Sequence, residues 1–381
     1  MRRCRDCTEQ PEQAPGLLIA GDFGSGKSHL LEHLHHLALE QNFVSSKVVI
    51  SKETPLYDPV KLYRAAIDAA VVPNRQGSAL REIAQDLEKA PQYGRFFERV
   101  ISDKGDFDTR FGATLQVYDY VRTRDLEQWD RVISFWSGHK LNTSEIKRYL
   151  RQSGNPSYRI GKITAKELAL QSFRFAAELM VTAGYSGWIL LIDETELIGR
   201  YSLLQRAKSY AELARWMGEL KDKHGVYPGI AVVFTITPDF EQVNLVEKND
   251  LEKIPARLQN RGADGDPLLE AQAKRGMKLL KKALPLNRLE ESQIEAVGEK
   301  LREVYARAYC WSPPPAIFRG EFLTSGRMRT YIRAWINQWD LERLYPNYQV
   351  EIEATELQQV NTEDRDLETP SESQEDERSF G

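Results

Sequence analysis

Short apolar runs separated by amphipathic segments organise the start of the chain. Residues 17–20 are apolar and end at a glycine-rich turn, and apolar residues then recur at helical spacing between residues 30 and 38. A β-branched run at 47–51 indicates a second strand, which Pro55 ends. The pattern predicts strand, loop, helix and strand in that order.

The middle of the chain, from about residue 60 to residue 185, is polar and has helical spacing. It contains no apolar run as strong as the first two. Large aromatic residues recur along it as candidate core anchors, namely Phe96, Phe97, Trp129, Phe135, Trp136 and Phe173. We predict an all-α insertion over 61–185.

Strands and helices alternate again after the insertion. Residues 188–192 are apolar throughout, as expected for a central parallel strand that is covered on both faces. A helix is predicted over 202–220, followed by a strand over 229–237 that Pro238 ends. We place the α/β core at 16–60 and 186–265.

The remaining pattern is helical. Apolar residues recur every three or four positions between Ile294 and Ala308, and a further helix is predicted around 326–340. These segments predict a helical lid domain over 266–350. The expected fold class is α/β, a P-loop, AAA+-like parallel sheet with a large all-α insertion and a C-terminal helical lid.

The charge distribution separates an acidic tail from the rest of the chain. The 381 residues are 41% hydrophobic and 28% charged, as in globular proteins with two or three packed units. Residues 351–381 contain eleven acidic and two basic residues, which predicts a disordered, solubilising tail rather than a docking segment. The preceding residues carry 50 basic and 45 acidic side chains, a balance that permits contact with DNA without arguing for it.

Residues 1–15 are expected to be a frayed terminus. Cys4 and Cys7 have the spacing of a zinc or redox pair, but further ligands at matching spacing and a preceding strand are missing. No run approaches the roughly 18 apolar residues that span a bilayer, and no signal peptide follows the basic start. We expect a cytoplasmic protein with no membrane partner.

A glycine-rich loop carries the strongest chemical signal. Its sequence is Gly21-Asp22-Phe23-Gly24-Ser25-Gly26-Lys27-Ser28, a complete Walker A pattern. Glycine allows the backbone N–H groups to wrap closely around a triphosphate, the lysine ammonium would lie between the β- and γ-phosphates of ATP, and the last serine would ligate Mg²⁺. An empty glycine turn is the alternative, which the position between a strand and a helix disfavours.

The histidines after the loop are less informative. His29 is the histidine closest to the phosphates along the chain, so we include it among the predicted ATP contacts. No histidine has metal-site spacing with an acidic partner, and we otherwise interpret them as structural.

Two carboxylates end the apolar strand at 188–192. Asp193 is placed to hold Mg²⁺ opposite Ser28, as a Walker B acid does. Glu194 follows directly and is predicted to polarise the attacking water, which favours hydrolysis over phosphoryl transfer to a metabolite. The alternative is that Glu194 and Glu196 stabilise a helix N-terminus, and we give Glu196 no special role.

The end of the next predicted strand supplies two threonines. Thr235 and Thr237 would emerge beside the acidic pair in a parallel sheet, where either hydroxyl could contact the γ-phosphate or the attacking water. We select Thr237 by its position as a catalytic residue, together with Glu194 and Lys27. Threonine is also common in strands for structural reasons, which is the alternative.

Four arginines are weaker candidates. Arg257 and Arg261 follow the strand and could reach the γ-phosphate of a neighbouring subunit in a homo-oligomer. Arg327 and Arg329 begin the predicted lid helix, where one of them, with Arg329 as our choice, could fold over the nucleotide as a sensor. A solvated helix face explains the same residues.

The order of these motifs resembles that of AAA+-like ATPases of the origin-recognition and STAND branch. More narrowly, the chain resembles the BREX system ATP-binding proteins, which are found with bacterial anti-phage modules. The resemblance covers about 16–350 and depends on residues 24–29 (GSGKSH), 51–56 (SKETPL), 187–198 (GWILLIDETELI), 208–217 (KSYAELARWM) and 327–336 (RMRTYIRAWI).

The resemblance implies ATP-driven work in a complex with other proteins, for defence or for a DNA transaction. Members of that family carry a longer segment before the glycine loop, whereas the loop of this chain begins at Gly21. A truncated start is therefore one interpretation, and it would remove part of an adenine pocket.

Several functional classes remain to be separated. The leading hypothesis is an ATPase that drives conformational change in a larger assembly, and the alternative is a nucleotide-gated binding module with little turnover. A small-molecule kinase is disfavoured by the acid directly after Asp193 and by the length of the insertion. A GTPase is disfavoured because no Asn-Lys-x-Asp segment is present. The pattern leaves open whether DNA, protein or both is the object of the work.

Overall fold

A computed structural model describes residues 16–102, 107–154, 158–220, 229–260, 266–287, 289–315 and 328–345. The predicted frayed terminus with its two cysteines, the acidic tail, Arg261 and Arg327 lie outside these residues. Within the described ranges, no helix combines the length and the apolarity needed to cross a bilayer.

One six-stranded sheet organises the described residues, in the order β3-β2-β4-β5-β1-β6. Neighbouring strands are parallel except for the pair β2 and β3. The strands are β1 (Gly16–Ala20), β2 (Val44–Val49), β3 (Ala70–Val71), β4 (Trp188–Asp193), β5 (Ile230–Ile236) and β6 (Leu284–Pro285). A mixed α/β fold with a mostly parallel sheet is therefore confirmed.

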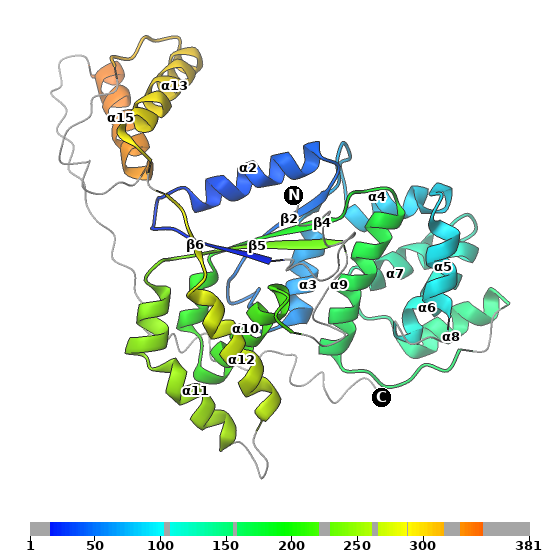
Figure 1. Cartoon of the computed structure of the whole chain (residues 1–381). Helices are drawn as coiled ribbons and strands as arrows, with labels where there is room; N and C mark the ends of the chain where they lie inside the picture. Colours follow the sequence, from blue (N-terminus) through cyan, green and yellow to red (C-terminus); the bar gives the residue numbers. More distant parts are fainter. Residues whose placement is uncertain are drawn as a thin grey trace.

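Helices cover both faces of this sheet. Figure 1 shows α2 along one face, with α3, α9 and α10 on the other. The helices are α2 (Lys27–Glu40), α3 (Pro59–Asp68), α4 (Ala79–Asp86), α5 (Tyr93–Ile101), α6 (Thr109–Val121), α7 (Leu126–Trp136), α8 (Thr143–Gln152), α9 (Ala165–Thr182), α10 (Leu203–Trp216), α11 (Asp250–Gln259), α12 (Pro267–Leu280), α13 (Glu291–Tyr309) and α15 (Met328–Leu344). Shorter turns are η1 (Leu87–Lys89), η2 (Thr195–Arg200) and η3 (Glu241–Glu247).

Strand β4 shows why the sheet needs cover on both faces. Ile189 and Leu191 belong to a cluster with Leu31 of α2, whereas Trp188 and Leu190 belong to the larger core on the opposite face. Side chains alternate between the faces of a strand, so an apolar residue at every position means two buried faces. The prediction of a central, doubly covered strand is confirmed.

Strand β2 begins earlier than the apolar pattern predicts. The expected run began at residue 47, but the strand starts at Val44 and includes Ser45 and Ser46, which are both buried. Ser45 Oγ lies 2.9 Å from His35 Nδ1, and Ser46 Oγ accepts a hydrogen bond from the indole of Trp188 at 2.8 Å. Hydrogen-bonded serines can occupy a buried strand, which hydrophobic spacing alone does not reveal.

Helices α4 to α8 gather beside α3 and α9 at one end of the sheet (Figure 1). Their aromatic residues share a core with the sheet, and Phe175 of α9 stacks on Phe111 of α6 at 4.8 Å between ring centroids. The predicted insertion contains one strand, β3, which adds two residues to the edge of the sheet. A strand of two residues carries no periodic signal, so the sequence gives no indication of it.

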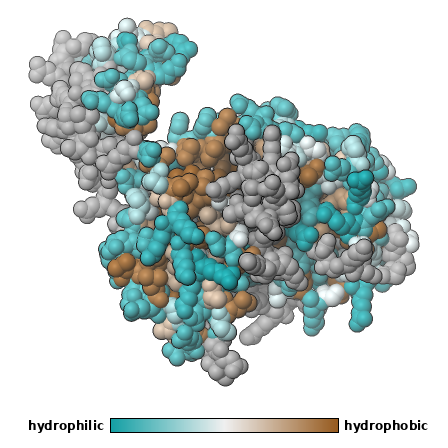
Figure 2. All heavy atoms as spheres, in the orientation of Figure 1, coloured by the Kyte–Doolittle hydropathy of each residue, from teal (hydrophilic) through white to brown (hydrophobic). Residues whose placement is uncertain are grey.

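The residues predicted as a lid pack in two different ways. Helix α12 lies against α10 beside the sheet, and Met277 belongs to the main core. Helices α13 and α15 form a separate cluster around Tyr305, Trp335 and Trp339. Figure 1 shows this pair projecting from the end of the molecule. Figure 2 shows hydrophobic residues on this view near β6, between α2 and the helices across the sheet.

The close contact between α10 and α12 depends on Gly276. A Cβ atom at this position would lie 1.8 Å from the carbonyl oxygen of Tyr210. We expect Gly276→Ala to lower the free energy of unfolding by about 3 kcal/mol, because the helices must separate. Urea unfolding followed by circular dichroism would measure the change.

A matched control is Gly94→Ala in α5, where an added Cβ meets nothing within 4 Å. Alanine is the better helix former, so this variant should gain about 0.5 kcal/mol or more. Equal stability of the two variants would contradict the contact between α10 and α12.

Candidate nucleotide site

The glycine loop, residues 21–28, connects the end of β1 to the start of α2. Gly24 and Gly26 have φ of 76° and 102°, a backbone region that L side chains rarely adopt. The N–H of Gly21 donates to the Ile236 carbonyl at 3.0 Å, which fixes the loop to the end of β5. The turn thus places the first N–H groups of α2 at the carboxyl edge of the sheet, where a helix N-terminus favours an anion.

Lys27 is folded back over the loop. Its side chain is buried, and the ammonium donates to the Gly21 carbonyl at 2.7 Å and to the Asp22 carbonyl at 3.4 Å. The same Nζ lies 5.0 Å from the centroid of the Phe23 ring and 3.7 Å from Glu196 Oε1. The positive charge is therefore held at the mouth of the loop by weak, replaceable contacts.

The acidic end of β4 lies at the same edge of the sheet. Asp193 Oδ1 accepts hydrogen bonds from the Glu194 N–H at 2.9 Å and from the Thr235 hydroxyl. Glu194 is exposed and has a φ of 57°, an uncommon value for a residue other than glycine. The β5 threonine thus orients the first acid, while the second turns toward solvent.

Glu196 is a buried acid that faces the loop from η2. It is 5% exposed, and burial raises the pKa of its carboxyl, with a smaller opposing effect from Lys27. The charges of Asp193 and Glu194 raise this pKa further. The sequence reading assigned Glu196 no special role, yet it is the carboxylate that contacts Lys27.

One cavity joins these parts. Its volume, counted by the positions that the centre of a water molecule can occupy, is about 800 Å³, within the range of small-molecule sites. All eight residues of the glycine loop line it, together with His29, Asp193, Glu194 and Glu196. The loop and the acidic strand end, more than 160 residues apart in sequence, therefore meet in space.

Helices α13 and α15 form the opposite wall of the cavity. Arg329 lines it, and its N–H donates to the Gly24 carbonyl at 3.3 Å. Arg333 lines it as well, one helical turn further along α15. The apolar part of the wall consists of Leu286, Leu289, Val297, Met328 and Ile332.

Other predicted residues lie elsewhere. Thr237 is buried and is not among the residues that line the cavity, so its catalytic role stays a prediction. Arg257 is on the exposed side of α11 and is also not among the lining residues.

Sequence reasoning missed Glu196, Arg333 and the apolar wall. A signal existed for Arg333, because it follows Arg329 by four residues and must share its helix face. Val297 was recognised only as part of an amphipathic helix. The burial of Glu196 had no sequence signal.

The residues at the cavity fit a phosphate group and a divalent cation. Ser25 Oγ is buried and has no hydrogen-bond partner within the described part of the chain. Leaving such a hydroxyl unpaired costs about 1–3 kcal/mol, and a phosphate oxygen could accept its hydrogen. The Ser28 hydroxyl and the Asp193 carboxylate are the oxygen ligands that Mg²⁺ prefers.

The buried charge of Glu196 predicts a pH-dependent gain in stability for Glu196→Gln. A carboxyl whose pKa is raised in the folded state destabilises the protein as the pH rises through that pKa. The variant should therefore unfold at higher temperature than the unmodified chain at pH 8, by the equivalent of about 1 kcal/mol. The gain should shrink toward pH 4, where the carboxyl is protonated in both states.

Differential scanning calorimetry at several pH values would measure this difference. Glu247→Gln, an exposed acid outside the cavity, is the control. A glutamine variant that is less stable at pH 8 would mean that attraction to Lys27 exceeds the cost of burial.

A layered, mostly parallel sheet with a glycine loop and an acidic strand end at its carboxyl edge is compatible with the P-loop class of nucleotide-binding proteins. The chain belongs to the family described as BREX system ATP-binding protein BrxC/D, whose model matches residues 12–92 and 96–339. The predicted resemblance to BREX system ATP-binding proteins is thereby confirmed. Neither the curated proteins nor the solved structures gave a match.

Proposed function

We propose that the chain binds ATP with Mg²⁺ in the cavity between the glycine loop and helix α15 and hydrolyses the γ-phosphate. The observation that carries this proposal is the shared cavity, which brings the loop, Asp193 and Glu194 together. Membership of an ATP-binding family supports the choice of nucleotide. The cavity is large enough for a nucleotide, and its apolar wall suits a base.

Each residue has a proposed part in this reaction. The N–H groups of the loop bind the phosphate oxygens, and Lys27 exchanges its carbonyl partners for the β- and γ-phosphates. Ser28 and Asp193 would hold Mg²⁺, which neutralises charge that develops on the phosphates. Glu194 accepts a proton from the attacking water.

Helix α15 is proposed to report the state of the nucleotide. The backbone of Arg329 already contacts the loop at Gly24, and its side chain and that of Arg333 line the cavity. Loss of the γ-phosphate removes an anionic partner for these arginines, which would release α13 and α15 from the loop. The proposed work is a conformational change passed to other proteins of a BREX complex in phage defence, or to DNA.

Phosphate release by the purified chain tests this function. ATP should be hydrolysed in the presence of Mg²⁺ and not in excess EDTA. Firm ATP binding with no release would favour a nucleotide-gated module instead. Adding duplex DNA separates the possible objects of the work, because stimulation by contact with its phosphates should fall as salt rises.

A further inference from the structure

A second cavity lies far from the glycine loop, at the junction of α3, α6, α7 and α9. Counted by positions of the centre of a water molecule, its volume is about 50 Å³. Since one water needs about 10–15 Å³ by this measure, the cavity holds a few waters or one small polyatomic group. It shares no lining residue with the nucleotide cavity.

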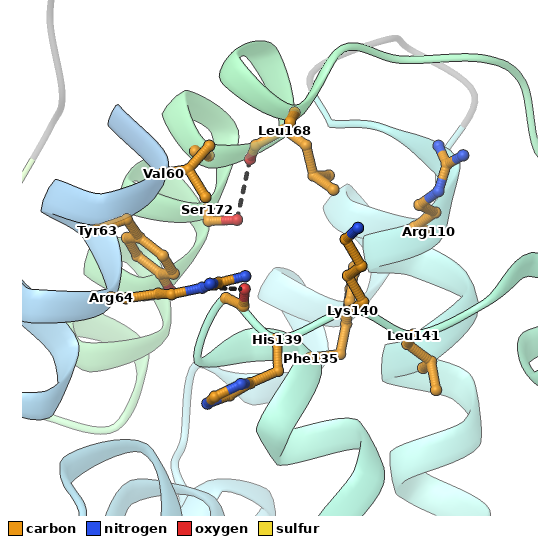
Figure 3. A pocket seen from close by; sticks show the side chains of 13 residues that line it. Val60, Tyr63, Arg64, Arg110, Phe135, His139, Lys140, Leu141, Leu168 and Ser172 are labelled. Atoms are coloured by element: carbon orange, nitrogen blue, oxygen red, sulfur yellow. Dashed lines mark hydrogen bonds between the residues drawn. The ribbon is translucent and has the colours of Figure 1, made fainter. Parts of the chain in front are cut away.

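The polar side chains of this cavity are cationic. Arg64, Arg110 and Lys140 line it, and none of the described lining residues is an Asp or Glu. Figure 3 shows Arg64 and the Ser172 hydroxyl on one side, with Lys140 extending into the same space from the other. Arg110 lies further out, at the edge of the view.

Two of these cations are held in place by neighbours. Arg64 donates through Nε to the Gly138 carbonyl at 2.9 Å, which fixes the plane of its guanidinium. Arg110 is 4% exposed, and its guanidinium contacts Asp108 and the Gly161 carbonyl at 2.9 Å each. Only one carboxylate therefore offsets the three cations in these contacts.

The loop between α7 and α8 brings Lys140 to this place. Gly138 has a φ of 91°, and a Cβ there would lie 3.0 Å from the Tyr63 ring and 3.1 Å from Arg64. The Tyr63 hydroxyl donates to the Trp136 carbonyl, which ties α3 to the end of α7. The position of the cavity is thus set by packing of the core and not by exposed side chains alone.

We propose that this cavity binds one phosphate group, either inorganic phosphate or the terminal phosphate of a larger molecule that extends into solvent. A phosphate has oxygens in four directions and up to two negative charges, which match cations that converge from opposite sides. A whole nucleotide exceeds the volume. A carboxylate is planar and carries a single charge, so it satisfies fewer of these donors.

The apolar walls strengthen the site. Phe135 and Leu141 are buried and line the cavity beside the cations. Interactions between charges increase where water is displaced by apolar side chains. A phosphate there should bind more firmly than one on an exposed pair of basic residues.

Binding of inorganic phosphate to the full chain tests the proposal. The Lys27→Ala background reduces the contribution of the glycine loop, and equilibrium dialysis with radiolabelled phosphate gives the dissociation constant. Lys140→Glu should weaken binding about tenfold or more, because an attractive charge becomes a repulsive one. Lys147→Glu on exposed α8, which does not line the cavity, makes the same charge change and should leave binding nearly unaltered.

Glycerol 3-phosphate and glycerol distinguish the two sources of phosphate. Binding of inorganic phosphate alone, sensitive to Lys140→Glu, identifies the free ion as the ligand. Equal, sensitive binding of glycerol 3-phosphate identifies a phosphate monoester. No saturable binding of either, or equal weakening by Lys140→Glu and Lys147→Glu, would overturn the site. Lys140→Ala, which loses the charge without reversing it, should weaken binding to an intermediate extent.

Discussion

Replacing Lys27 by alanine is expected to weaken the binding of Mg-ATP about 100-fold or more. Two effects add in this variant. The phosphates lose an ammonium with several charge-assisted hydrogen bonds, each worth about 1.5–3 kcal/mol. Glu196 also loses the cation 3.7 Å from its Oε1, so a buried acid is left unpaired beside the phosphates.

A double variant separates these two effects. Glu196→Gln in the Lys27→Ala background removes the repulsion and should recover part of the lost affinity, about tenfold. Titration with a fluorescent ATP analogue would measure all four combinations. The control is Lys253→Ala on exposed α11, outside the cavity, which should bind as the unmodified chain does. Unchanged affinity in Lys27→Ala would show that the loop does not hold the triphosphate.

Replacing Glu194 by glutamine is expected to lower ATP hydrolysis about 100-fold or more while the affinity for Mg-ATP changes little. General base catalysis contributes about 10²–10⁴-fold, and glutamine cannot accept the proton. Glu194 lines the cavity from an exposed position, so the substitution leaves the packing intact. Single-turnover phosphate release and a binding titration on the same preparation would separate the two quantities.

The backbone of Glu194 supports this assignment. A φ of 57° in a residue other than glycine costs roughly 1 kcal/mol or more and occurs often at functional sites. The control is Glu247→Gln, an exposed acid outside the cavity. A release rate that stays equal to that of the unmodified chain would exclude Glu194 as the base and favour the nucleotide-gated module.

The strongest strands were predictable because they are apolar for a structural reason. Residues 188–192 pack against helices on both faces, and their sequence carries that requirement directly. The first half of β2 was missed because its buried serines bond to neighbours that only the fold supplies. Strands β3 and β6 have two residues each and exist because a longer strand offers its edge.

The meeting of the glycine loop and Asp193 followed from strand order, since parallel strands end at one edge. The choice between two threonines did not. Residues two apart share a face of the strand, so spacing could not separate Thr235 from Thr237, whereas the register of β4 and β5 brings Thr235 to Asp193. The burial of Glu196 arises where η2 packs under the loop, a tertiary contact without local pattern.

Calorimetric titration of ATP with Mg²⁺ into the full chain tests the central claim most directly, because it measures joint binding by the loop and the acidic strand end. We expect saturable binding of one nucleotide per chain, weakened when Mg²⁺ is removed or when Asp193 is replaced by asparagine. Absence of heat at millimolar ATP, or binding that is indifferent to both changes, would contradict the account.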